Sequence, residues 1–123
     1  MSTEENKALV RRLAEAWVTL DPETFEEQHA SDIQWRGIDQ YLEGREAVKE
    51  VYLAQFDLYK DRHYTVEDLI AEGDKIAAKF LFRGTLMSGE QELLTGINIY
   101  RISDGRVQEA WFVWQEGEAA DSA

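Results

Sequence analysis

Three residues that could do chemistry alternate along the predicted strand Arg106–Gln115, namely Glu109, Trp111 and Gln115. Side chains of a strand alternate between its two faces, so these three share one face. If that face lines an apolar interior, a carboxyl group on it can take and return a proton near neutral pH, because burial favours its neutral form. The amide of Gln115 would offer a ligand one acceptor and two donors, and Trp111 would form an aromatic wall. Two other interpretations stay open: Gln115 ends the sheet in solvent, and Glu109 is a structural hydrogen-bond partner.

Helical spacing directs three more aromatic side chains toward the interior. Trp17 belongs to the apolar stripe of a predicted first helix, while Tyr52 and Phe56 belong to that of a predicted third helix, Arg45 to about Tyr59. Aromatic residues at this spacing either fill a core or line a pocket, so all three are candidates for both roles. A buried Tyr52 hydroxyl is expected to find a hydrogen-bond partner.

The composition argues against several kinds of site. The chain has no cysteine, so it can form neither a disulfide nor a thiolate metal site. Its two histidines, His29 and His63, lie far apart, so we expect no dedicated metal site, although carboxylates could hold a hard cation. Neither histidine has an obvious Asp or Ser partner for a nucleophilic triad. Both are expected to be structural or exposed.

The charge and the apolar pattern limit the expected partners. The net charge is −12, with 25 acidic and 13 scattered basic residues, which argues against nucleic acid because phosphate binding requires clustered Lys and Arg. This acidity fits either a salt-adapted source or a soluble surface. No apolar run approaches the roughly 18 residues of a membrane span, and Met1–Lys7 is too acidic for a signal sequence. We therefore expect a cytoplasmic protein that binds no membrane.

Helix signals come first in the chain and strand signals afterwards. Three amphipathic helices are expected within residues 3–59, interrupted by a brief strand around Ile33 and Trp35, and period-two segments follow from His63 onward. This order predicts an α+β fold in which the helices pack on one face of a curved antiparallel sheet, forming a cone with a pocket at its open end. We expect one domain over residues 1–115 and a mobile acidic tail over residues 116–123.

The last strand has bulky side chains on both faces, which indicates a second cover for the sheet. Trp111 and Val113 lie on one face, and Phe112 and Trp114 lie on the other. An antiparallel sheet with one wet face would show polar residues at every second position. The chain's own helices can cover one face, so we expect a partner copy to cover the outer one, giving a homodimer. Which face lines the pocket stays open: Arg101 points to the dimer interface in one register and into the pocket in the other.

The order of elements and several short motifs resemble the SnoaL-like polyketide cyclases of the nuclear transport factor 2-like superfamily, whose cystatin-like fold is cone-shaped. The resemblance covers roughly residues 6–115. It is carried by the segments Glu67–Thr85 and Thr95–Trp111, and within them by Glu72-Gly73-Asp74, Arg83-Gly84-Thr85, Thr95-Gly96 and Asp104-Gly105-Arg106 followed by Glu109 and Trp111.

The resemblance implies chemistry that needs no cofactor: an Asp in the apolar cone removes a proton next to a carbonyl, and the carbanion attacks a second carbonyl. The family usually carries this Asp four residues after the Trp of its E-x-W motif, where this chain has Gln115. The resemblance also implies that Gln115 faces the cone, and that Trp35 and Arg36 occupy a place where an aromatic residue precedes a polar pocket residue. Arg36 could bind a carboxylate or enolate oxygen, or pair with a surface acid.

Two functions from different classes follow. The first is a cofactor-independent aldol cyclase, isomerase or hydrolase that acts on a small, largely apolar or aromatic molecule in the cone. The second is a non-catalytic ligand-binding or dimeric interaction module that keeps the fold without the acid. The candidate ligand contacts are the same for both, namely Trp17, Trp35, Arg36, Tyr52, Phe56, Trp111 and Gln115.

Overall fold

The first helix begins at a reciprocal cap. In the computed structural model, which describes residues 2–116, the Ser2 hydroxyl accepts a hydrogen bond from the Glu5 backbone N–H at 3.1 Å, and the Ser2 N–H donates to the Glu5 carboxylate at 2.8 Å. The helix ends at Leu20, which adopts a left-handed conformation with φ of 59° and donates its N–H to the Ala16 carbonyl. Asp21 then caps the second helix, with Pro22 in its first turn.

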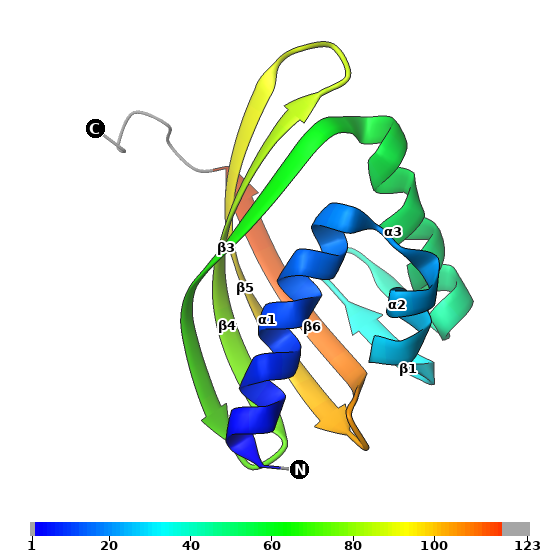
Figure 1. Ribbon diagram of the computed structural model, residues 1–123, viewed down its shortest axis with the longest axis vertical. Coiled ribbons are helices and arrows are strands. Elements are labelled where there is room, and N and C mark those ends of the chain that lie inside the picture. Colours follow the sequence, from blue (N-terminus) through cyan, green and yellow to red (C-terminus); the bar gives the residue numbers. More distant parts are fainter. Residues whose placement is uncertain (1, 117–123) are drawn as a thin grey trace.

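Nine elements follow one another along the described chain. They are α1 Thr3–Thr19, α2 Pro22–Gln28, β1 His29–Arg36, β2 Tyr41–Glu43, α3 Arg45–Leu58, β3 Tyr59–Glu72, β4 Lys75–Leu86, β5 Gln91–Ser103 and β6 Arg106–Glu116. The six strands form one sheet in the order β2-β1-β6-β5-β4-β3. The helices lie together on one side of this bent sheet, so the expected α+β fold is confirmed (Figure 1).

The sheet is mixed rather than fully antiparallel, which corrects one detail of the prediction. β1 runs parallel to β6, with Trp35 opposite Ala110 and Arg36 opposite Trp111. The chain leaves β1 through β2 and α3 and completes β3, β4 and β5 before β6 returns beside it. Local periodicity cannot reveal such a pairing, because the partners are distant in sequence. β2 was also not predicted, and β1 begins at His29, earlier than the expected strand around Ile33.

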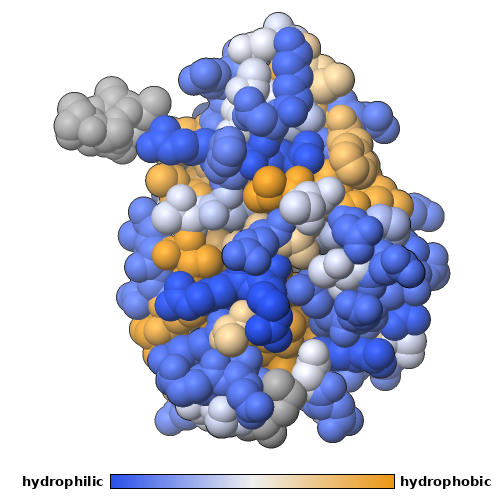
Figure 2. All heavy atoms as spheres, viewed as in Figure 1, coloured by the Kyte–Doolittle hydropathy of each residue, from blue (hydrophilic) through white to orange (hydrophobic). Residues whose placement is uncertain are grey.

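The core lies between the helices and the concave side of the sheet. Side chains that are almost fully enclosed include Val10 and Leu13 of α1, Tyr52 of α3 and Phe82 of β4. The outward faces of the helices are mainly hydrophilic, with apolar residues visible between them (Figure 2). This division follows the amphipathic patterns of α1 and α3.

The ends of the described chain bear on two expectations. Glu116 is the last residue of β6, so it belongs to the sheet rather than to the expected mobile tail 116–123. Residues 117–123 lie outside the described residues. No helix in the described part is long and apolar enough to span a bilayer.

Candidate functional site

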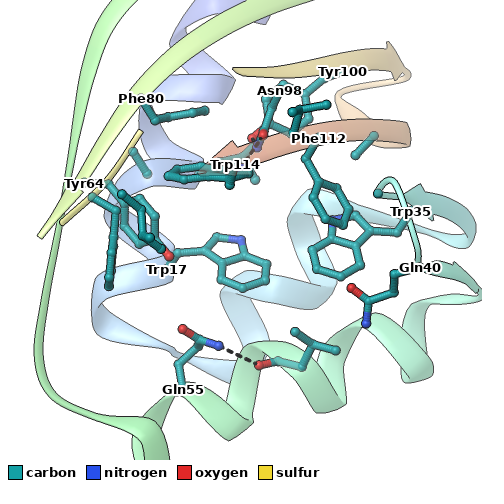
Figure 3. A pocket seen from close by; sticks show the side chains of 18 of the residues that line it. Trp17, Trp35, Gln40, Gln55, Tyr64, Phe80, Asn98, Tyr100, Phe112 and Trp114 are labelled. Atoms are coloured by element: carbon teal, nitrogen blue, oxygen red, sulfur yellow. Dashed lines mark hydrogen bonds between the residues drawn. The ribbon is translucent and has the colours of Figure 1, made fainter. Parts of the chain in front are cut away.

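A cavity of about 560 Å³ lies between the sheet and the helices (Figure 3). This volume is within the range that binds small organic molecules. Its walls are largely aromatic and aliphatic, and they come from α1, α3, the β1–β2 loop and the inner faces of β1 and β3–β6. The aromatic lining residues are Trp17, Trp35, Tyr59, Tyr64, Phe80, Phe82, Tyr100, Phe112 and Trp114.

The sheet wall depends on a glycine. The indole of Trp114 lies so close to Gly96 that a Cβ on Gly96 would be 2.2 Å from the Trp114 Cδ2 atom. Trp114 also stacks on Phe80, with ring centroids 5.9 Å apart and an interplanar angle of 15°. Gly96 therefore allows a large indole to lie against the sheet and form a smooth apolar surface.

Two tryptophans, one from a helix and one from the sheet, form another part of the cavity wall. Trp17 of α1 and Trp35 of β1 are nearly parallel, with centroids 6.2 Å apart, and Trp35 also contacts Phe112 at 4.4 Å. The edge of Trp17 meets Tyr52 at 5.1 Å. The rings of Trp17, Trp35, Phe112 and Trp114 occupy the middle of the close-up view (Figure 3). Trp17 and Trp35 thus line the cavity, and whether they contact a ligand stays a prediction.

A short hydrogen-bonded chain crosses the sheet side of the cavity. The Trp114 indole N–H donates to the Asn98 Oδ1 atom at 2.8 Å, and the Asn98 Nδ2 atom donates to the Tyr100 hydroxyl at 2.8 Å. Burial raises the pKa of Tyr100 to about 12, so its hydroxyl is protonated at neutral pH. Asn98 and Tyr100 lie on the opposite side of the aromatic rings from Gln40 and Gln55 (Figure 3).

His29 is a buried neutral imidazole that lines the cavity. Its Nδ1 atom is 2.8 Å from the Phe25 carbonyl, which can only accept, so Nδ1 carries the proton. Burial lowers the pKa of His29 to about 4, against the smaller raising effect of the Phe25 hydrogen bond, and the Arg45 charge lowers it further. The Nε2 lone pair has no hydrogen-bond partner among residues 2–116. A neutral imidazole in this tautomer can accept a proton or a hydrogen bond.

The loop side of the cavity is more polar. Asp39 and Gln40 come from the β1–β2 loop and Gln55 from α3, and the Gln55 amide donates to the Val51 carbonyl at 3.4 Å. Asp39 is the only carboxylate among the described lining residues. The Tyr59 hydroxyl donates to the half-buried Glu92 carboxylate, and burial together with this bond raises the Tyr59 pKa. Among residues 2–116, no group of three or more carboxylates or imidazoles is placed to hold a metal ion.

The expected orientation of β6 is wrong. Ala110, Phe112 and Trp114 alternate along β6 and line the cavity, so the side chains of the other face, with Trp111 and Gln115, point away from it. Val113 also borders the cavity, but its side chain belongs to this other face and is 55% exposed. Gln115 is exposed, opposite Thr95 of β5. The residues alone left the inner face open, because both faces of β6 carry large apolar side chains, and the family resemblance had implied that Gln115 faces the cone. Gln115 therefore does not put its amide where a cavity acid would stand.

Other candidates on the same outer face are occupied by contacts with one another. Glu109 accepts a hydrogen bond from Arg101 at 2.6 Å, which is the structural role considered as its alternative. Trp111 lies between two cations, with Arg36 and Lys75 each 6.0 Å from its ring. The Arg36 guanidinium also donates a hydrogen bond to the Gln34 Oε1 atom at 2.6 Å. These side chains form an outer polar cluster and none of them lines the cavity.

Two helix candidates also lie outside the cavity lining. Tyr52 is fully buried, and its hydroxyl contacts the Ala16 and Asp21 carbonyls at 3.1 and 2.9 Å, so it is a core residue. Phe56 is 52% exposed and lies under the Arg62 guanidinium. Trp17 alone of the three helix candidates reaches the cavity.

Sequence reasoning missed His29, Asn98 and Tyr100 as cavity residues. Asn98 and Tyr100 alternate along a strand that is otherwise mostly apolar, and a lone amide at such a position indicates an interior polar site. His29 gave a weaker signal, because it follows a short helix and was expected only to be structural or exposed. Its ring is buried and bonds the Phe25 carbonyl of that helix. His63 is exposed, as expected.

A model of one protein family, described as SnoaL-like domain, matches residues 10–110. The match includes all the cavity-lining residues except Phe112, Val113 and Trp114. No curated protein matches the chain.

Solved structures with the same fold come from several bacteria. IdmH, described as a putative polyketide cyclase from Streptomyces antibioticus, is 27% identical, with a TM-score of 0.77 over 89% of this chain and 91% of that one. A putative hydroxylase from Streptomyces galilaeus, AclR, is 22% identical, with a TM-score of 0.81 over 93% and 77%. An epoxide hydrolase of the LEH-like kind from M. tuberculosis is 12% identical, with a TM-score of 0.81 over 92% and 84%. The last two similarities establish the fold alone.

Proposed function

Because this chain belongs to the SnoaL-like domain family, we propose that its cone cavity binds a small, largely apolar molecule that contains at least one ring. The observation that supports this best is the aromatic lining, with Trp17, Trp35, Phe112 and Trp114 around an open volume of about 560 Å³. Apolar walls with a few polar groups are typical of small-molecule sites. The neighbour described as a putative polyketide cyclase is consistent with a ligand of the polyketide class.

The proposal can be tested with a matched pair of tryptophans. Trp35 lines the cavity, whereas Trp111 lies on the opposite face of the sheet. We expect Trp35→Ala to weaken binding of a bicyclic probe such as tetralin roughly tenfold, because an aromatic wall contact is lost. Trp111→Ala should leave the dissociation constant unchanged. Equal weakening by both substitutions, or by neither, would contradict binding in the cavity.

A second candidate function is cofactor-free proton transfer, and the tautomer of His29 favours it. With Nδ1 donating to Phe25, the Nε2 atom carries the imidazole lone pair, which can remove a proton next to a ligand carbonyl. Burial opposes the imidazolium that results, since it lowers the pKa of His29 to about 4. The result would be cyclase, isomerase or hydrolase chemistry with His29 in place of the family's usual Asp. Gln115 takes no part in this scheme, because it lies on the outer face.

Deuterium exchange at the carbon next to the carbonyl of 2-tetralone, followed by NMR, tests the second candidate. General base catalysis typically supplies about 10²–10⁴-fold in rate, so His29→Gln should reduce exchange by that factor if the wild-type protein catalyses it. His63→Gln, which changes an exposed imidazole, is the control. If the wild type shows no exchange above buffer, the protein binds without this chemistry.

The outer sheet face supports the expected homodimer as a further proposal. Ile97 lies opposite Val113, and these two residues are 54% and 55% exposed in the single chain. Ile99 lies opposite Trp111 and is 40% exposed. Adjacent exposed apolar residues of this kind are typical of an interaction surface. We expect a solution mass near twice 14.2 kDa and a monomer for Ile99→Glu. A wild-type monomer at all concentrations would contradict this interface.

A further inference from the structure

The chain of hydrogen bonds from Trp114 to Tyr100 has a fixed direction. An indole N–H can only donate, so the Asn98 atom that faces Trp114 must be the carbonyl oxygen. The amide nitrogen of Asn98 then faces Tyr100, and it can only donate as well. The Tyr100 oxygen therefore accepts the hydrogen bond from Asn98, and the Tyr100 hydroxyl hydrogen is left for another partner.

The protein offers no such partner in its described part. No hydrogen bond from the Tyr100 hydroxyl to another residue occurs within residues 2–116, although the side chain is only 8% exposed. Two other tyrosines show the contrast: the Tyr52 hydroxyl is satisfied by the Ala16 and Asp21 carbonyls, and the Tyr59 hydroxyl by Glu92. Buried donors are normally paired, so the unpaired hydrogen of Tyr100, in a residue that lines the cavity, indicates a ligand atom as its acceptor.

We propose that Tyr100 donates a hydrogen bond to an oxygen acceptor on the ligand, so that the cavity selects ring compounds that carry a carbonyl or enolate oxygen. The orientation is set by Trp114 through Asn98, which makes Asn98 a positioning residue and Tyr100 the specificity-determining one. This inference rests on the proposed function, because it assumes that a ring compound occupies the cavity, and it adds the chemical class of that compound. A site with a fixed donor rejects analogues that lack the acceptor, since the donor is then left unpaired.

Three probes with one carbon skeleton test the selection: tetralin, 1-tetralol and 1-tetralone. We expect NMR titrations of the wild type to give a roughly tenfold lower dissociation constant for the ketone than for the hydrocarbon. Tyr100→Phe should remove this preference and leave tetralin binding nearly unchanged. Tyr41→Phe makes the same chemical change outside the lining of this cavity and should keep the preference.

Reversing the direction of the hydrogen bonds between Trp114, residue 98 and Tyr100 gives a sharper test. A carboxylate only accepts, so in Asn98→Asp both the Trp114 N–H and the Tyr100 hydroxyl would donate to residue 98. Two such donors favour the charged form of the new carboxyl group, whereas burial favours its neutral form, so the probes are compared at a pH above the carboxyl pKa measured by ¹³C NMR. The Tyr100 oxygen would then offer lone pairs to the ligand, and we expect the preferred probe to change from 1-tetralone to 1-tetralol. A ¹H–¹⁵N spectrum in which the Trp114 indole signal persists would confirm that the fold is kept.

The outcomes separate the two proposals. If all three probes bind without a ketone preference, or if the preference survives Tyr100→Phe, the role of Tyr100 is wrong while the cavity remains a binding site. If Asn98→Asp folds and still prefers the ketone, the fixed direction is wrong. If none of the probes binds the wild type, the proposed function fails and this inference fails with it.

Discussion

The two faces of β5 and β6 carry different kinds of polar residue. On the inner face, Trp114, Asn98 and Tyr100 are linked by neutral hydrogen bonds and enclosed by aromatic rings. On the outer face, Arg101 and Glu109 form an ion pair. The inner groups are neutral and partly buried, and their hydrogen bonds have a defined direction, whereas the outer pair carries charges that remain partly solvated, where ion pairs contribute little. A neutral amide inside an apolar strand is therefore a better indicator of the site than a charged residue beside a tryptophan.

The largest expected difference between the faces concerns stability. Phe82→Ala removes an inner side chain that is 2% exposed and should cost about 3–5 kcal/mol in the free energy of unfolding. Val113→Ala, on the outer face, should cost less than about 1 kcal/mol in a monomer. Urea unfolding at several protein concentrations checks both values. A concentration-dependent cost for Val113→Ala alone would support a second copy on the outer face, and equal costs for both would contradict the comparison.

The buried imidazole on the inner side should make stability depend on pH. The folded pKa of His29 is about 4, below the usual 6.5, so between these values the unfolded chain binds more protons than the folded one. The stabilisation is fully present above pH 6.5 and is lost as the pH falls toward 4, by up to about 3 kcal/mol. Unfolding measured at pH 4.5 and pH 7 for the wild type and His29→Gln checks this. An identical pH dependence in the two proteins would contradict a neutral buried His29.

A smaller loss of stability is expected where Trp114 of the inner face lies close to Gly96. Gly96→Ala would place a Cβ 2.2 Å from the Trp114 ring, so the indole must move and its bond to Asn98 should break. We expect a loss of about 1–3 kcal/mol in stability, as for other overpacked sites, and a change in tryptophan fluorescence. The same substitution in a Trp114→Leu background should cost less, because the clashing ring is absent. An additive double mutant would show that the contact is unimportant.

The smallest effect is expected at the residue that the sequence first suggested. Gln115→Asp changes an exposed side chain on the outer face, so stability should change by no more than about 0.5 kcal/mol. Ligand binding and any proton exchange should be unaffected. A gain of exchange activity in Gln115→Asp would mean that this side chain reaches the cavity, contrary to the orientation of β6.

Local patterns predicted the elements well and the orientation of the last strand poorly. Helical spacing found the three helices and period-two patterning found the long strands, because these signals depend on near neighbours. The order of the elements and the family resemblance both predicted a cone-shaped fold. The side of β6 that faces inward depends on pairing with β1 and β5, which the alternation of large residues on both faces does not encode. Trp17 and Trp35 line the cavity, and their role as ligand contacts stays a prediction, while the polar group of Asn98 and Tyr100 was missed.

The parallel pairing of β1 with β6 has a consequence for how the protein is made. Trp35 belongs to the first strand and its partner Ala110 to the last one in the sequence, so these contacts join distant parts of the chain. During synthesis on the ribosome, the helices and β1 emerge well before β6, so β1 cannot form its pairing with β6 until the last strand has been made. Such long-range contacts slow folding. Formation of the aromatic cavity should therefore be a late step that requires nearly the whole polypeptide.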